Sequence, residues 1–332
     1  MVLCGAGIIL SLSVGSQLIP PHEIVNDALG FGALSDTDLI VVRDIRLPRT
    51  LLALFAGGSL AVAGLLMQTL FKNPLADPHI LGVTSGASLA VACFLLVGPL
   101  FLANSATSLS SSVFKLGTLG SAALGAFCVS TIIATISRKM PPTVVLIIGL
   151  MIAYATGALI GLLLHQSEST ALQSFISWSF GSFAGASWSE LSTFIPISVV
   201  CCFAALVSSK RLDVAYLGDS DVRSLGFDPK SNLRVGIIIA SVIAGSVTAF
   251  CGPIAFIGIA APHLAHFIFK QSSHQILILQ SAAVGGLLAL LADILSRGVG
   301  LQISLPLGSV TALIGAPFVI WILIRSYRYD FA

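Results

Sequence analysis

Long apolar segments follow one another along the whole chain, and short polar stretches separate them. A helix that crosses a bilayer needs about 20 predominantly apolar residues, and most of these segments approach that length. The pattern predicts about ten membrane-spanning helices, near residues 2–18, 50–70, 80–103, 113–137, 143–164, 191–208, 233–250, 254–269, 276–295 and 307–324. The predicted fold class is therefore all-α, a polytopic membrane helical bundle in which residues 1–332 form a single transmembrane domain.

The composition supports a membrane protein, because 56% of the 332 residues are hydrophobic and only 9% are charged. Soluble proteins carry about 25% charged residues. The net charge of +2 and the lack of a long basic block argue against a nucleic-acid partner. The six cysteines lie in apolar segments without a C-x-x-C motif, so we interpret them as small hydrophobic residues and expect no metal site.

The distribution of Lys and Arg predicts the orientation, because basic residues concentrate on the cytoplasmic side. With both termini inside, the inner side collects Lys72, Arg138, Lys139, Lys210, Arg211, Arg223, Lys230, Arg234, Lys270, Arg325 and Arg328. The outer side collects Arg43, Arg46, Arg49, Lys115 and Arg297. Both termini are therefore expected in the cytoplasm, and the arginine cluster at 43–49 is the local exception.

The longest soluble-like segment, residues 210–230, lies on the predicted inner side. It is expected to form two short helices, with Asp213 capping the first, Asp219 or Ser220 capping the second, and Pro229 ending it. Its apolar residues would face a soluble partner, and these are Val214, Leu217, Val222 and Leu225. The alternative is an ordinary interhelical loop packed on its own protein.

Polar residues flank the second apolar segment. Arg46-Leu-Pro48-Arg49 precedes it, and a prolyl turn follows it, with Asn73, Pro74, Asp77 and Pro78. The prolines break the helix, and the Asn73 and Asp77 side chains can satisfy the freed backbone groups. Gln68, one turn inside the membrane, is expected to hydrogen-bond across helices.

Further polar or small residues occur within the apolar segments. His263, next to Pro262, is expected to be a structural hydrogen-bonding group. Asp293 and Arg297 are four residues apart and can pair on one helix face, although an intramembrane acid is equally a functional candidate. Small residues at four-residue spacing predict close helix packing, at Ala53, Gly57 and Ala61 and at Gly285, Ala289 and Asp293. The weaker segment 171–184 is expected to be half-inserted or to line a pore.

No catalytic motif is visible, since G-x-S-x-G, H-E-x-x-H and G-x-x-x-x-G-K-[ST] are all missing from the sequence. The chain is therefore not expected to be an enzyme. If nucleotide drives its function, another subunit must bind that nucleotide.

Four ordered blocks carry a family resemblance, at Arg43–Ala87, Leu217–Phe227, Gly252–Phe267 and Leu291–Leu323. They include RLPR, KNPLADP, LGDSDVRSLGF, GIAAPH and LPLGSVTALIG. The chain resembles the FecCD-type permease family, which serves iron-siderophore, haem and cobalamin ABC importers. His266 departs from the pattern, because the family usually has Arg there.

The resemblance implies a type II ABC importer permease architecture in the bacterial inner membrane. It implies a dimer with a second copy or a sister permease, two ABC ATPase subunits that bind ATP and Mg, and a periplasmic substrate-binding protein. No cofactor is implied in this chain itself. The ferric siderophore is the favoured cargo, with haem and cobalamin as alternatives.

The resemblance also implies residue roles. The coupling helices that seat in the ATPase would contain Leu217, Gly218, Asp219, Val222, Arg223, Leu225 and Gly226. Arg46, Arg49 and Arg297 align with family arginines that meet acidic residues on the two lobes of the binding protein, and Arg–carboxylate pairing is directional.

Three other functions remain open from the residues. An ion-coupled secondary transporter would need acids on broken helices near the midplane, and Asp293 is the clear candidate. An intramembrane protease would need paired catalytic groups at one depth, where only single residues occur. A permease for bare zinc or manganese would not carry the four blocks.

Overall fold

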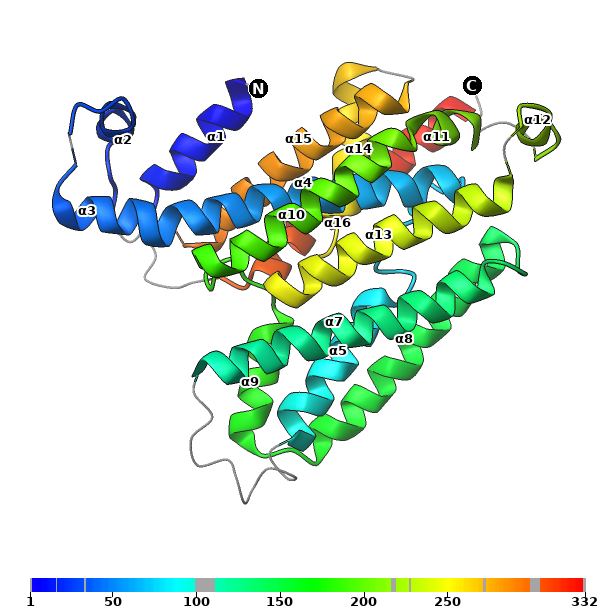
Figure 1. Ribbon diagram of the computed structural model, residues 1–332, viewed down its shortest axis with the longest axis horizontal. Coiled ribbons are helices and arrows are strands. Elements are labelled where there is room, and N and C mark those ends of the chain that lie inside the picture. Colours follow the sequence, from blue (N-terminus) through cyan, green and yellow to red (C-terminus); the bar gives the residue numbers. More distant parts are fainter. Residues whose placement is uncertain are drawn as a thin grey trace.

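The chain forms a bundle of helices in the computed structural model (Figure 1). The structure describes residues 2–15, 17–32, 34–98, 111–215, 219–226, 228–270, 273–298 and 305–330, and no strand occurs among them. Six of its helices are long and apolar enough to cross a membrane, and four shorter apolar helices lie at 3–13, 83–97, 257–269 and 307–321. These ten helices correspond in order to the ten predicted spans, and the all-α fold class is confirmed.

The described residues form a series of helical segments. In chain order they are α1 (Val2–Ser13), α2 (Pro21–Ala28), α3 (Asp36–Ile40), η1 (Val41–Arg46), α4 (Leu47–Leu70), α5 (Val83–Ala92), η2 (Cys93–Val97), α7 (Ser111–Ile136), α8 (Pro142–His165), α9 (Ser169–Ser179), α10 (Trp188–Val207), α11 (Ser209–Ala215), α12 (Asp219–Ser224), α13 (Pro229–Cys251), α14 (Ile257–Phe269), α15 (His274–Ser296) and α16 (Leu307–Asp330). Here η marks a π-helical stretch, in which the turn is wider than in an α-helix.

The second span begins much earlier than the apolar pattern predicts. Helical structure runs without a break from Asp36 to Leu70, whereas the prediction began at Thr50. The Ser35 hydroxyl accepts a hydrogen bond from the Asp38 backbone N–H at 3.2 Å, and acidic residues fill the first turn, which stabilises the helix start. The charged residues at 43–49 interrupt the apolar pattern but not the helix, so this prediction was wrong.

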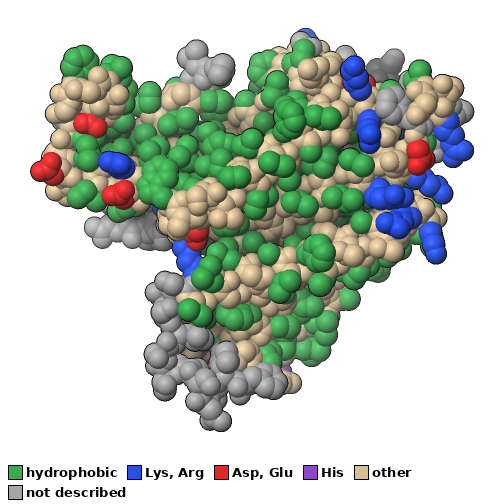
Figure 2. Space-filling model, in the orientation of Figure 1, with side chains coloured by type: hydrophobic (Ala, Val, Ile, Leu, Met, Phe, Trp, Pro, Cys, Tyr) green, Lys and Arg blue, Asp and Glu red, His purple; other side chains and the backbone are tan. Residues whose placement is uncertain are grey.

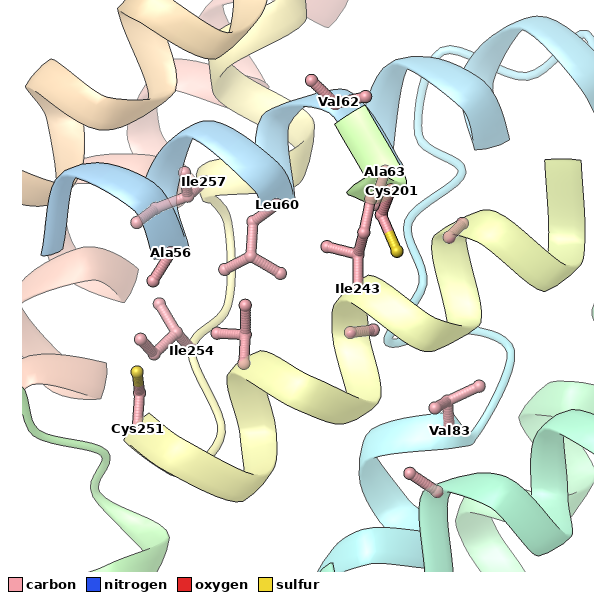
Figure 3. Packing of buried hydrophobic residues seen from close by; sticks show 14 of the residues in the cluster. Ala56, Leu60, Val62, Ala63, Val83, Cys201, Ile243, Cys251, Ile254 and Ile257 are labelled. Carbon is pink, nitrogen blue, oxygen red and sulfur yellow. The ribbon is translucent and has the colours of Figure 1, made fainter. Parts of the chain in front are cut away.

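Helix α4 is the centre of the bundle. It packs against α10, α13, α14 and α15, and 83% of its most apolar window is buried. Glycines allow two close backbone approaches: a Cβ on Gly57 would lie 2.3 Å from the Gly285 carbonyl oxygen, and one on Gly64 would overlap the Gly258 carbonyl oxygen. The predicted packing of small residues is thereby confirmed. Figure 3 shows Leu60 of α4 and Ile243 of α13 in the apolar space between these helices.

A second group of helices, α5, α7, α8 and α9, packs beside α13 (Figure 1). Only 22% of the apolar window of α7 and 17% of that of α8 are buried within the chain. Helices that leave so much apolar surface outside their own bundle are suited to contact with the lipid of a bilayer. Figure 2 accordingly shows an apolar surface along the length of the helices.

The charged side chains lie at the two ends of the long helices. Figures 1 and 2 together show Lys and Arg gathered at the end that carries α12, which we call the α12 end. The opposite end, which carries α2 and α3, shows charges of both signs and is called the α3 end. The candidate sites lie at these two ends.

Candidate functional sites at the two ends of the bundle

The segment 210–230 forms two short helices at the α12 end, as predicted. Helix α11 ends at Ala215, and α12 covers Asp219–Ser224. Gly226 follows with φ +82°, a conformation that favours glycine and ends the second helix. Pro229 was predicted to end the second helix, but it occupies the first position of α13 instead. Asp228 caps α13 by accepting from the Lys230 and Ser231 backbone N–H groups.

The predicted apolar stripe of this segment is divided between two environments. Val222 was predicted to face a partner, but it is only 2% exposed and packs within the chain. Leu225, in contrast, is 56% exposed, and Arg223 and Gly226 are exposed beside it. Asp219 begins α12, while Leu217 and Gly218 lie outside the described residues. Of the predicted apolar stripe, the residue that the structure shows exposed is therefore Leu225, at the C-terminal end of α12.

Asp213 joins the segment to the membrane helices instead of capping α11. Its Oδ1 accepts from the backbone N–H of His274, the first residue of α15, at 2.9 Å, and lies 2.7 Å from His274 Nδ1. The other ring nitrogen of His274 lies 3.0 Å from the hydroxyl of Thr69, near the end of α4. His274 is 1% exposed, so this buried chain of contacts links α11, α15 and α4. Sequence reasoning missed it, because nothing local to His274 indicates its partners.

The prolyl turn after α4 has the predicted local bonds. Asn73 Oδ1 accepts from the Leu75 N–H at 3.0 Å across Pro74, and Asp77 Oδ1 accepts from the His79 N–H at 2.9 Å across Pro78. These bonds satisfy backbone groups that the prolines leave without helical partners.

Two side chains hold this turn and α4 against α14. Gln68 Nε2 donates to the Gly258 and Ile259 carbonyls at 3.3 Å, and His263 Nε2 lies 2.8 Å from the Pro74 carbonyl. Pro262, within α14, is buried and precedes His263. These are the kinds of contact expected of Gln68 and His263 as structural hydrogen-bonding groups.

At the α3 end, Asp293 forms a buried ion-pair cluster with two arginines. Its carboxylate is 0% exposed and pairs with Arg297 in the same helix, as predicted. It also pairs with Arg49, whose Nη2 lies 2.7 Å from Asp293 Oδ1 and whose Nε lies 2.8 Å from the same oxygen. The partner on α4 was not predicted, because 244 residues separate Arg49 from Asp293.

Arg46 and Arg297 also hold the end of α1. Arg46 Nη1 donates to the Leu12 carbonyl at 2.6 Å and to the Ser13 carbonyl at 3.0 Å. Arg297 Nη1 donates to the Ser11 and Val14 carbonyls at 2.6 and 2.7 Å. The last carbonyls of a helix have no intrahelical partner, so these guanidinium groups cap α1.

The arginines expected to face a docked partner are therefore part of the internal structure. Arg46 is only 5% exposed, and the side chains of Arg297 and Arg49 are 7% and 21% exposed. All three nevertheless line an open cavity of about 600 Å³ at the α3 end. The other polar lining side chains are neutral, so the walls carry only positive charge, with Asp293 behind them. Pro48 is buried at the start of α4, between Arg46 and Arg49.

Helix α9 reaches the same cavity. It has 11 residues, too few to cross a bilayer, which agrees with the prediction for 171–184. After α9, Gly181 and Gly252 approach each other so closely that a Cβ on Gly252 would lie 2.9 Å from Gly181 Cα. The Ser182 N–H donates to the Cys251 carbonyl, and the Gly308 N–H donates to the Phe180 carbonyl, both at 2.8 Å. The segment therefore joins the ends of α13 and α16.

Among the residues that the structure describes, no group of three or more His, Cys, Asp or Glu side chains could hold a metal ion. The polar sites at both ends consist of ion pairs and backbone caps. Their geometry is suited to holding helices in place and to presenting charge to another molecule.

Comparison with known proteins agrees with this architecture. Residues 3–325 match the FecCD transport family. The chain is 35% identical to the hemin transport system permease protein HmuU of Yersinia pestis, covering 85% of this chain and 83% of that one. It is 34% identical to the Fe(3+)-citrate import system permease protein YfmD of Bacillus subtilis, covering 95% and 90%. It is 32% identical to the vitamin B12 import system permease protein BtuC of Klebsiella pneumoniae, covering 96% and 90%.

A solved structure gives the same result at the level of fold. This structure is an inward-facing conformation of a metal-chelate type ABC transporter, 27% identical in sequence, with a TM-score of 0.84 over 98% of this chain and 97% of that chain. Family, helix order and fold agree from one end of the chain to the other. The chain belongs to the FecCD transport family and is a multi-pass membrane permease.

Proposed function

We propose that the chain is the membrane-spanning subunit of an ABC importer that carries an iron chelate, most simply a ferric siderophore, across the bacterial inner membrane. The single observation that carries the proposal is the match to one transport family over residues 3–325. The relatives are permeases for hemin, siderophore, Fe(3+)-citrate and vitamin B12, which are metal complexes or, for the siderophore, an iron-binding ligand. Haem and cobalamin are therefore the alternative cargoes.

The proposal assigns the α12 end to the cytoplasm, with both termini. Basic side chains gather there, as expected on a cytoplasmic face (Figure 2). A soluble ATPase with bound ATP and Mg would contact the exposed end of α12, where Leu225 supplies an apolar contact and Arg223 a charge. The chain of contacts from Asp213 through His274 to Thr69 would then carry movement of this segment to α15 and α4.

At the other end, the arginine cavity would receive carboxylates of a periplasmic binding protein. Arg46, Arg49 and Arg297 line it, and among the described residues no acidic side chain does. The positive charge of these walls favours the binding of an anionic group. Because these guanidiniums already bind backbone carbonyls and Asp293, a docked carboxylate would add to an ordered network. Docking could thereby alter the ends of α1, α4 and α15.

Transport would follow alternating access in a dimer with a second copy or a sister permease. ATP binding and hydrolysis in the ATPase would move the α12 segment, and the tightly packed α4–α15 pair would transmit this movement along the membrane. The binding protein would supply specificity, so a path lined by Ser, Gly and aliphatic residues would bind the cargo weakly and release it.

The test is reconstitution of the permease with its ATPase and binding protein in vesicles. Uptake of a labelled ferric siderophore that requires ATP, Mg and binding protein is expected, with labelled haem and cobalamin as parallel cargoes. Uptake that continues without ATP and stops when the ion gradient collapses would instead establish an ion-coupled secondary transporter.

A further inference from the structure

A second cavity of about 600 Å³ lies at the α12 end, away from the exposed tip of α12. Its walls come from the end of α4, the turn between α7 and α8, the helices α11 and α12, and the start of α13. Neither the family match nor the contacts described above assign a ligand to it.

The polar part of this cavity is suited to an anion. Lys72, Lys139 and Lys230 line it, and no Asp or Glu does. Asn232 also lines it, and this side chain is only 6% exposed, with no hydrogen-bond partner for its Nδ2. A buried amide donor without a partner is unfavourable, so an acceptor oxygen placed here would be stabilising.

The rest of the lining is apolar, which distinguishes the ligand from a free ion. Leu70, Phe71, Met140 and Leu233 line the cavity next to the basic side chains. A small hydrated anion gains nothing from such walls, whereas a lipid has both an anionic phosphodiester and apolar chains. The ligand that fits both parts of the lining is amphiphilic.

The position of the cavity also fits a lipid. It lies where α7 ends and α8 begins, and these two helices leave most of their apolar surface outside the bundle. The bilayer surrounds that surface, so a lipid can reach the cavity sideways from the leaflet. Basic pockets between membrane helices on the cytoplasmic side are a known form of site for anionic lipid head groups.

We propose that this cavity binds an anionic phospholipid, with the phosphodiester at Lys139, Lys230 and the Asn232 amide. Because Ala215 and Val222 belong to the same walls, the lipid would contact α11 and α12 and hold them against α13. The leaflet composition would thereby influence the segment that contacts the ATPase. The binding site itself does not depend on the transport function proposed above.

The experiment uses the purified full chain in a neutral detergent, with phosphatidylglycerol and phosphatidylcholine as probes. Native mass spectrometry and thermal-stability measurements are expected to show that phosphatidylglycerol binds more tightly than phosphatidylcholine. The double variant Lys139→Ala/Lys230→Ala should bind phosphatidylglycerol roughly 25-fold more weakly, about fivefold for each lysine removed. Asn232→Leu should also weaken binding, without any change in net charge.

The matched control is Lys210→Ala/Arg211→Ala, which removes the same charge from exposed residues at the same end that do not line the cavity. It should bind phosphatidylglycerol like the wild type. Equal losses in both double variants would overturn the proposal in favour of general surface attraction. Equal affinity for phosphatidylcholine would overturn it too, as would inorganic phosphate giving the same stabilisation as the lipid.

Discussion

His274 Nδ1 and Asp213 Oδ1 lie 2.7 Å apart, although 61 residues separate them in the sequence. The imidazole is buried at the start of α15, whereas the Asp213 side chain is 42% exposed on α11. This contact and the Thr69 bond make His274 the point at which the α12 segment is joined to two central helices. A side chain with both ring nitrogens engaged fixes these helices relative to one another.

Replacing His274 is therefore expected to loosen this joint. In His274→Ala, the buried Thr69 hydroxyl loses a partner, which costs about 1–3 kcal/mol, and the partly exposed Asp213 carboxylate loses one that water can replace. We expect a lower unfolding midpoint of the chain in detergent and, in the reconstituted transporter, more ATP hydrolysed per cargo molecule carried. The control is His22→Ala, because the side chain of His22 is 73% exposed. Unchanged stability and unchanged ATP use in His274→Ala would contradict the role of this contact.

Removing the buried carboxylate of Asp293 should lower the free energy of unfolding far more than removing a carboxylate whose partner is exposed. Asp293→Asn leaves the guanidiniums of Arg49 and Arg297 close together without their counter-ion, and breaking a buried pair costs about 3–5 kcal/mol. Glu190→Gln serves as the control, because its partner Lys115 has a side chain that is 51% exposed and glutamine keeps an oxygen that can accept the Ser187 N–H bond of the helix cap. That change should cost about 1 kcal/mol or less. Denaturant unfolding of both variants measures the difference, and equal effects would refute the prediction.

The Gly64 position tests the close packing of α4. A Cβ there would overlap the Gly258 carbonyl of α14, so Gly64→Ala must push these backbones apart and should destabilise the fold or prevent it. Gly161→Ala, on the open surface of α8, meets nothing within 4 Å and should be neutral or stabilising by up to about 1 kcal/mol. Expression level and thermal stability of the two variants distinguish these outcomes. A Gly64→Ala protein as stable as the wild type would disprove the contact.

Leu225 tests the proposed contact with the ATPase. Leu225→Asp changes an exposed side chain, so the chain should insert and fold normally but lose co-purification with the ATPase. Val222→Asp, three residues earlier, places a carboxylate at a buried position and should destabilise the chain itself. Size-exclusion profiles of each permease variant, alone and with the ATPase, separate these effects. Undiminished ATPase binding by Leu225→Asp would contradict the role of this surface.

Several features could be predicted because their cause is local. Runs of apolar residues identify helices for a bilayer, since backbone groups in lipid must be satisfied within the segment. The turn at 73–78 depends on side-chain bonds over two residues, as at Asn73 and Asp77. The pairing of Asp293 with Arg297 follows from their i, i+4 spacing on one helix.

Other features could not be predicted, because their cause lies far away in the sequence. The family resemblance implied that Arg46, Arg49 and Arg297 meet a docked partner, but Arg46 is buried where the α1 carbonyls need donors. Val222 is buried because α12 folds back onto the chain, and His274 has a role only because α4 and α11 meet at its ring.

The sequence by itself determined the class of protein, the number and order of its apolar helices and its family resemblance, because each depends on residues close together in the chain or on ordered motifs. Only the tertiary structure decided which polar side chains are exposed and which hold helices together. The physical reason is that a buried charge or amide must find its partner in space, and 244 residues of chain can separate Arg49 from the carboxylate that neutralises it.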